Sequence, residues 1–140
     1  MIKKTVTYTD WDGEAVTESL WFNMNKAELL ELNKKYGSAL DKFLRRSIEK
    51  EQYTKLAVFW KDFILKSYGT KTDDGKHFIK SDEAAKEFYQ SIAFDKVFDE
   101  VLSSDAAADA FVNGVLNGIR LTNGENLVAV KGGGDGNAAD

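Results

Sequence analysis

The spacing of apolar residues changes once near the start of the chain. Residues 2–8 and 15–22 are rich in β-branched and aromatic types, and the turn-forming residues Asp10–Gly13 separate them. This pattern predicts a β-hairpin. Simple alternation would place the even-numbered residues Val6, Tyr8, Val16, Leu20 and Phe22 on the core side. Glu18 interrupts that alternation, so the sequence leaves the register open.

The spacing becomes helical after Met24. Asn25 with Glu28 three residues later forms a capping-box pattern, and Met24 can pack on Leu29 as a hydrophobic staple. Gly37 is typical of the residue that ends a helix. These signals predict a first helix from Asn25 to Tyr36.

Further helices follow from apolar stripes and serine caps. The second begins at Ser38, with its stripe at Leu40, Phe43, Leu44 and Ile48. The third runs from about Gln52 to Tyr68 and ends at Gly69, in the left-handed conformation that closes a helix. A charged loop with a turn at Asp74-Gly75 follows, and Ser81 caps a fourth helix from Asp82. That helix either continues or bends into residues 94–102, and Ser104 caps a last helix that ends at Gly118.

The end of the chain differs in composition from the rest. Residues 127–131 predict a short strand, and the glycine-rich residues 132–140 predict a flexible, disordered tail. The predicted fold is therefore mainly α, of the α+β class. An N-terminal β-hairpin, about five helices and the short C-terminal strand form one domain over residues 1–131, and residues 132–140 form the flexible tail.

Composition narrows the range of functions. The chain has 140 residues, no cysteine, one histidine, no proline and a net charge of −4. The missing cysteines exclude disulfides and thiolate chemistry, and the charge argues against nucleic-acid binding. No apolar run approaches the roughly 20 residues of a membrane span, and the start lacks a signal-peptide pattern. We therefore expect a cytoplasmic protein that binds neither nucleic acid nor membrane.

No candidate for chemistry stands out. Asp10, Asp12 and Glu14 lack the later ligands of a calcium loop, so a hairpin turn is the better interpretation. The run 73–76 could hold a metal or phosphate, but no glycine-rich nest surrounds it. His77 has no nucleophile motif nearby, and nothing selects one carboxylate pair for acid–base work. We expect no catalytic residue, no metal and no cofactor.

The aromatic third helix has two interpretations, the hydrophobic core or a groove for a partner. The core suits Phe59, Phe63 and Ile64, whose spacing gives one face. Trp60 and Tyr68 are open between the two. The candidate partner-binding residues are Trp60, Tyr68, Asp73, Asp74, Lys76 and Phe78.

Four stretches resemble the tail assembly chaperones of long-tailed, siphovirus-type bacteriophages and prophages of Gram-positive bacteria. They are the opening residues 4–13, residues 22–30, the segment Phe63–Gly69 with residues 73–76 and 78–81, and residues 106–114. The middle stretch is the most specific. The resemblance spans residues 1 to about 118 and says little about the rest.

The resemblance implies a non-enzymatic chaperone that binds the phage tape measure protein and keeps it soluble. It further implies help in loading tail tube subunits during tail morphogenesis, in the cytoplasm of the infected host and outside the mature virion. Members often have a longer product, made by programmed frameshift, that recruits tail tube protein. The codons for Lys131–Gly134 are compatible with a slippery site. Self-association is left open. The alternatives are another phage-encoded interaction protein, such as an inhibitor of a host factor, and an enzyme with dispersed acidic residues.

Overall fold

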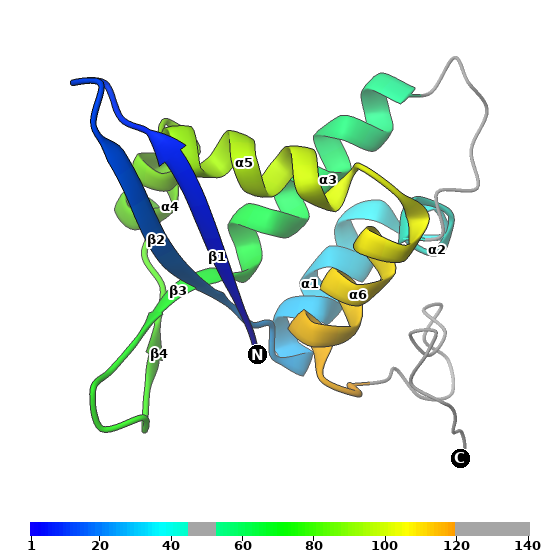
Figure 1. Cartoon of the computed structure of the whole chain (residues 1–140). Coiled ribbons are helices and arrows are strands. Elements are labelled where there is room, and N and C mark those ends of the chain that lie inside the picture. The colour runs from blue at the N-terminus through cyan, green and yellow to red at the C-terminus, as the bar shows by residue number, and fades with distance from the viewer. Residues whose placement is uncertain (45–52, 120–140) are drawn as a thin grey trace.

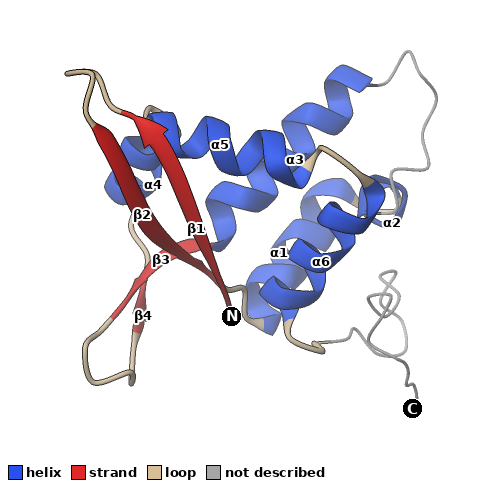
Figure 2. Ribbon diagram, in the orientation of Figure 1, coloured by secondary structure: helices blue, strands red, loops and turns tan. Residues whose placement is uncertain are grey.

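The computed structural model describes residues 1–44 and 53–119. In this part of the chain a sheet is covered by helices (Figures 1 and 2). The strands and helices, in chain order, are β1 (Ile2–Thr9), β2 (Ala15–Phe22), α1 (Lys26–Tyr36), α2 (Ala39–Leu44), α3 (Tyr53–Ser67), β3 (Tyr68–Lys71), β4 (Phe78–Ile79), α4 (Asp82–Tyr89), α5 (Ile92–Val101) and α6 (Asp105–Leu116). The α+β class and the N-terminal hairpin are confirmed. The predicted features at Ile48, Gln52, residues 127–131 and residues 132–140 lie outside the described residues.

The N-terminal hairpin pairs β1 with β2 over eight residues each, from Ile2 opposite Phe22 to Thr9 opposite Ala15. Val6, Leu20 and Phe22 are buried, as the alternation predicted. Glu18 also faces inward, and its carboxylate accepts a hydrogen bond of 2.7 Å from the Tyr8 hydroxyl. The Tyr8 hydroxyl therefore gives a hydrogen-bond partner to Glu18, the polar residue that interrupted the apolar alternation of the strand.

Short side chains begin the helices, as the sequence indicated. Asn25 and Glu28 form the reciprocal capping box, with bonds of 2.8 and 3.0 Å to each other's backbone amide. Ser81 and Ser104 accept hydrogen bonds from the third residue of α4 and α6. Gly37, at a φ of 57°, ends α1. These local predictions are confirmed.

The long apolar run after Ser81 divides into two helices. Gln90 ends α4, and Ser91 caps α5 by accepting a bond from the amide of Phe94 at 3.2 Å. Of the two alternatives, the bend is therefore the correct one. Six helices are described, where the sequence indicated about five.

The prediction for Gly69 was wrong. Helix α3 ends at Ser67, and Gly69 lies in strand β3, where it pairs with Trp21 of β2. Strands β3 and β4 then pair with each other, which extends the sheet to the order β1-β2-β3-β4. The segment 68–79, expected to be a helix end and a loop, is a second hairpin.

One hydrophobic core joins the sheet to the helices. Phe22 of β2 packs edge-on against Phe111 of α6 at 5.2 Å between ring centroids, and Phe63 of α3 contacts the same ring at 6.1 Å. The two ends of the described chain also meet. A Cβ placed on Gly114 of α6 would lie 2.7 Å from Ile2 of β1, so glycine permits this close approach.

Candidate interaction surface

The second hairpin, residues 68–79, projects from the body of the molecule at its lower left (Figure 1). Its turn is tightly bonded. Asp74 Oδ1 accepts bonds from the Thr72 hydroxyl at 2.7 Å and from the Lys76 amide at 3.0 Å, and these bonds lower the pKa of the Asp74 carboxyl. Gly75 has a φ of 75°, which glycine adopts without strain. The charged loop is therefore a defined turn.

Glycine at position 69 lets the hairpin close on itself. A Cβ there would lie 2.6 Å from the ring of Phe78 and 2.9 Å from the carbonyl oxygen of Ile79. Any larger residue would push β4 away from β3. Gly69 thus allows strands β3 and β4 to lie close together.

Lys80 ties the base of the second hairpin to the body. Its ammonium donates to the carbonyls of Asn23 and Lys66, both at 2.7 Å, and to Glu28 Oε1 at 2.8 Å. Burial lowers the pKa of Lys80, although Glu28 opposes this shift. One cation therefore joins the last turn of α3, the start of α1 and the end of β4.

The candidate residues have different environments. Trp60 is fully buried, so its ring can reach no partner in the folded chain. Tyr68 is half-buried and stacks on Phe88 at 4.2 Å. Asp73, Asp74 and Lys76 are exposed on the turn of the second hairpin, and Phe78 is half-buried above Gly69. Five of the six candidates therefore lie on the second hairpin, whereas Trp60 lies in the core.

Sequence reasoning missed Ile79, which is 56% exposed on β4. The signal available for it was its place beside Phe78 in a short β-favouring pair after a turn. With β4 recognised as an edge strand, alternation would have turned one of the two side chains outward.

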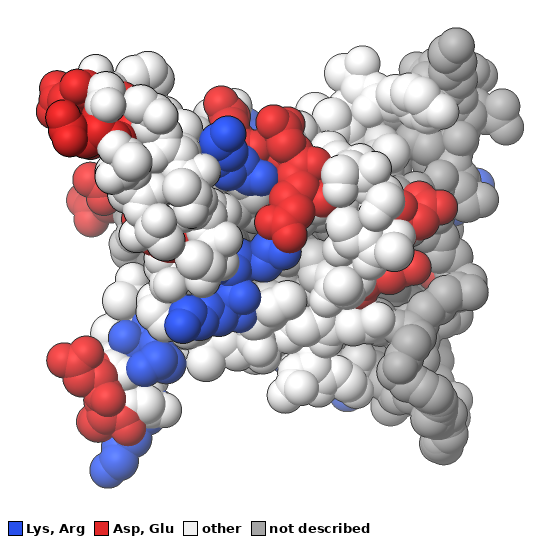
Figure 3. All heavy atoms as spheres, in the orientation of Figure 1, with Lys and Arg blue, Asp and Glu red and all other residues white. Residues whose placement is uncertain are grey.

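Charge gathers at the tips of both hairpins (Figure 3). The tip of the second hairpin mixes acidic and basic residues. The tip of the first, at the upper left of the view, is acidic and contains Asp10, Asp12 and Glu14. Trp11 stands among these acids with 83% of its surface exposed.

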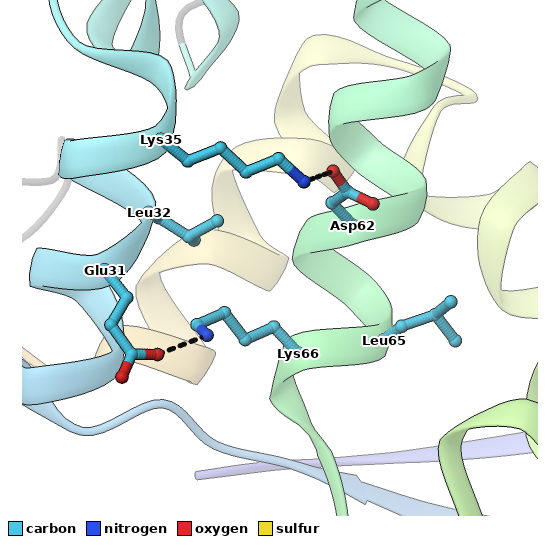
Figure 4. A pocket seen from close by; sticks show the side chains of 6 residues that line it. All are labelled: Glu31, Leu32, Lys35, Asp62, Leu65 and Lys66. Carbon is cyan, nitrogen blue, oxygen red and sulfur yellow. Dashed lines mark hydrogen bonds and ion pairs between the residues drawn. The ribbon is translucent and has the colours of Figure 1, made fainter. Parts of the chain in front are cut away.

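Two hollows lie on the side formed by α1, α2 and α3. Figure 4 shows the first, between α1 and α3, where Lys35 pairs with Asp62 at 2.8 Å and Glu31 with Lys66 at 2.6 Å. Leu32 lies between these ion pairs. The second hollow has apolar walls and is lined by Tyr36, Phe43, Thr54, Lys55 and Val58.

Asp62 lines the first hollow and Tyr36 lines the second. The Tyr36 hydroxyl donates to Asp62 Oδ2 at 2.5 Å. Burial, followed by this bond, raises the pKa of Tyr36 above its usual range. Burial alone would raise the pKa of Asp62, but the bonds from Lys35 and Tyr36 outweigh it, and the pKa is lowered. The hydrogen bond between Tyr36 and Asp62 therefore holds α1 against α3.

Residues 1–44 and 53–119 contain no group of three side chains able to hold a metal ion. His77 lies exposed in the turn of the second hairpin. Within the same residues, no helix is long and apolar enough to cross a bilayer.

These features define a small α+β protein that presents exposed Trp11 and Ile79 on its two hairpins and an apolar hollow beside α2 and α3. Comparison with protein families identifies it further. The family model described as phage tail assembly chaperone matches residues 1–117, and the chain belongs to that family. No curated protein and no solved structure matches the chain.

Proposed function

We propose that this chaperone binds the tape measure protein of a long-tailed phage of Gram-positive bacteria and keeps it soluble. It then helps to load tail tube subunits and leaves before the virion is complete. It acts in the cytoplasm of the infected host, by binding and without chemical turnover. Membership of the tail assembly chaperone family supports the role in tail assembly, and the resemblance of residues 63–81 to that family suggests the partners.

The exposed apolar side chain at the edge of the sheet is the observation that carries this proposal. Ile79 is 56% exposed on β4, the last strand of the sheet, with half-buried Phe78 next to it. A long helical tape measure exposes apolar surface until the tube encloses it. The second hairpin offers a small apolar contact with charged residues at its tip, which suits reversible cover of such a surface.

Reversibility follows from the small size of each contact. One exposed isoleucine and its half-buried neighbour bury little area, so each copy binds weakly. Many copies along one long target still hold it strongly in total, because linked contacts raise the effective concentration of each other. Tube subunits can then displace them one at a time.

Co-expression with a tape measure fragment tests the proposal. We expect the wild-type chain to co-purify with the fragment and keep it in the soluble fraction, and Ile79→Asp to lose both effects. The matched control is Leu30→Asp, because Leu30 is another exposed apolar residue, on α1 and outside the second hairpin. Equal retention by wild type, Ile79→Asp and Leu30→Asp would remove the second hairpin from the binding surface.

The tail tube partner is proposed to bind through a longer, frameshifted product. Lys131–Gly134 can be encoded by a homopolymeric run, which permits slippage of the ribosome. Mass spectrometry of the products of the native gene region should show two proteins that share their N-terminal part. A single product would exclude the frameshift. A chain ending at Lys131 should still keep the tape measure fragment soluble. Loss of solubility would show that residues 132–140 contribute to binding.

A further inference from the structure

The helices of this protein cover one face of the sheet and leave the other face open. Phe22 of β2 is buried against the helices. Its neighbour Trp21 points to the opposite side, called the outer face here, because successive side chains of a strand alternate between faces. The register pairs Trp21 with Lys3 of β1, so Thr5 and Thr7, two and four residues later, also lie on the outer face. Both threonines are exposed, so no described element covers them.

One end of the outer face combines two aromatic rings with two cations. The ammonium groups of Lys3 and Lys71 each lie 5.8 Å from the centre of the Trp21 ring. Phe78 pairs with Lys71 and packs over Gly69, the residue beside Trp21 in the sheet. Both rings are half-buried, so part of each stays accessible. We call this group the basic aromatic patch, defined as Lys3, Trp21, Lys71 and Phe78. Figure 3 shows basic side chains gathered where the first hairpin meets β3.

The two lysines of the basic aromatic patch form no ion pair within residues 1–44 and 53–119. By contrast Lys4, on the other side of the same strand as Lys3, pairs with Glu100 at 2.5 Å. The Trp21 ring attracts the ammonium groups of Lys3 and Lys71 instead. Two like charges beside one ring repel each other, so a carboxylate placed near both would be stabilised by both.

Charge and shape together favour an acidic protein segment on this face. The described strands turn no carboxylate to the outer face, so the patch is locally basic in a chain of net charge −4. Beside the patch, the hydroxyl groups of Thr5 and Ser19 lie 3.3 Å apart and those of Thr7 and Thr17 lie 3.1 Å apart. These short side chains let a segment approach the sheet closely, and complementary charge then determines its position.

A nucleic acid fits the same face less well. Phosphate binding requires a concentrated basic surface, whereas the patch supplies two cations. Asp10, Asp12 and Glu14 stand at the other end of the first hairpin, where they would repel a nucleic acid strand that follows β1 and β2. A short acidic segment can contact the lysines without reaching that turn.

We propose that the outer face binds an acidic segment of a protein partner. Its carboxylates meet Lys3 and Lys71, and its aliphatic side chain lies on the ring of Trp21. This surface is different from the one in the proposed function, because Ile79 follows Phe78 in β4 and points to the opposite side of the sheet. One chaperone can therefore hold an apolar segment at Ile79 and an acidic segment on the outer face at the same time.

Fluorescence anisotropy with labelled synthetic peptides tests the proposal on the purified full chain. The probes are a peptide of repeated Leu-Glu-Glu units and two peptides of equal length in which glutamine or lysine replaces every glutamate. We expect the acidic peptide to bind at least about tenfold more tightly than the glutamine peptide, because ionised partners form the stronger hydrogen bonds. The lysine peptide should not bind, and added salt should weaken binding of the acidic peptide.

Charge reversal locates the contact. Lys3→Glu and Lys71→Glu should each weaken binding of the acidic peptide about tenfold or more, because each places a carboxylate opposite another. Lys34→Glu is the matched control, since Lys34 is exposed on α1 and its reversal changes the net charge equally. Ile79→Asp should bind the peptide like the wild type, which separates failure of this proposal from failure of the surface at Ile79. Circular dichroism and thermal melting confirm that each variant is folded.

Trp21 itself reports on the patch. In a Trp11→Phe background the accessible tryptophan signal comes from Trp21, because Trp60 is fully buried. The anion iodide should quench this signal more than the cation caesium does, and the acidic peptide should reduce quenching by iodide. Adding Lys3→Glu to the same background should remove both effects.

Several outcomes would overturn the proposal. Equal affinity for the acidic and glutamine peptides would do so, and so would equal losses in Lys3→Glu and Lys34→Glu, because net charge alone would then explain binding. A single-stranded RNA oligonucleotide that binds more tightly than the acidic peptide, and is lost in Lys3→Glu, would assign the face to nucleic acid. Peptide binding that strengthens in Asp12→Asn would assign it to the acidic turn of a second copy.

Discussion

At the scale of single residues, short polar side chains at helix starts determine where the helices begin. Asn25 satisfies an orphan amide of α1, and the N3 glutamate Glu28 returns a bond to the Asn25 backbone. The same Glu28 carboxylate accepts from Lys80, so the capping box is linked to the base of the second hairpin. Glu28 therefore both caps α1 and bonds to a residue far away in the sequence, Lys80.

Replacing the cap residue should cost a modest and measurable amount. Asn25→Ala should lower the free energy of unfolding by about 1 kcal/mol, because the amide of Glu28 loses its acceptor. Denaturant titration measures the change, and Lys26→Ala, one residue further on the exposed side of α1, is the control. Equal stability of Asn25→Ala and the wild type would contradict the assigned role.

Aromatic residues in the core should have a larger effect. Phe63 is fully buried and contacts Phe59, Trp60 and Phe111. Phe63→Ala should destabilise the fold by about 3–5 kcal/mol, since it removes buried surface and leaves a cavity.

Phe78→Ala provides the comparison, because Phe78 is only half-buried and should cost less. Denaturant unfolding of the two variants gives the difference directly. Similar losses of unfolding free energy in Phe63→Ala and Phe78→Ala would show that burial does not determine the loss at these two positions.

At the scale of elements, helix α1 is held to α3 by a bonded carboxylate. The hydrogen bonds from Lys35 and Tyr36 keep the pKa of Asp62 below its ordinary value in the folded chain. The unfolded chain then binds the proton more readily. The stabilisation is present above the ordinary pKa of aspartate, near 4, and is lost as the pH falls through the lower folded value.

Acid titration of stability should therefore depend on this residue. Between neutral pH and about pH 3, the wild type should lose more unfolding free energy than Asp62→Asn, which cannot titrate at that position. Lys35→Met removes one donor and keeps the Tyr36 bond, so it should fall between the two. Parallel curves for all three would show that Asp62 contributes nothing to the acid response.

Elements with local signals could be predicted, and those that depend on distant pairing could not. The first hairpin and the caps at Asn25, Ser81 and Ser104 follow from neighbouring residues. Strand β3 follows from pairing of Tyr68 and Gly69 with Phe22 and Trp21, far away in the sequence. A glycine after a helical run is equally compatible with a helix end, so the sequence could not distinguish these roles.

The environments of the candidate partner-binding residues were predicted in part, for the same reason. The charged turn at Asp73–Lys76 was evident from Asp74-Gly75, because turn chemistry is local. Burial of Trp60 depends on which side of α3 faces the core. Its spacing fitted the core, but an aromatic residue serves equally well in a core or at an interface. Exposure of Ile79 required knowledge that β4 is the edge strand.

At the scale of the whole molecule, the close approach of β1 and α6 gives a test of global packing. Gly114→Ala places a methyl group 2.7 Å from Ile2. Alanine favours a helix over glycine by about 1 kcal/mol, yet crowding at a packed contact costs about 1–3 kcal/mol. We expect net destabilisation of Gly114→Ala in thermal or denaturant unfolding.

If the contact with Ile2 is removed, Gly114→Ala should no longer destabilise the fold. In an Ile2→Ala background, the further change Gly114→Ala should be neutral or stabilising, because only the helix preference remains. A double-mutant cycle over the four proteins measures the coupling. If Gly114→Ala alone stabilised the fold, the contact with Ile2 would be too soft to matter.

This contact between the second residue and the last described helix also orders events on the ribosome. The core face of the first hairpin is covered by α5 and α6, the last two described elements to be translated. Phe22 meets Tyr68, Phe88 and Phe111, so its cover is completed only by α6. Ile2 likewise gains its contact with Gly114 only when residues 105–116 have left the exit tunnel. The described core of this chaperone therefore stays incomplete until its last described helix has been translated.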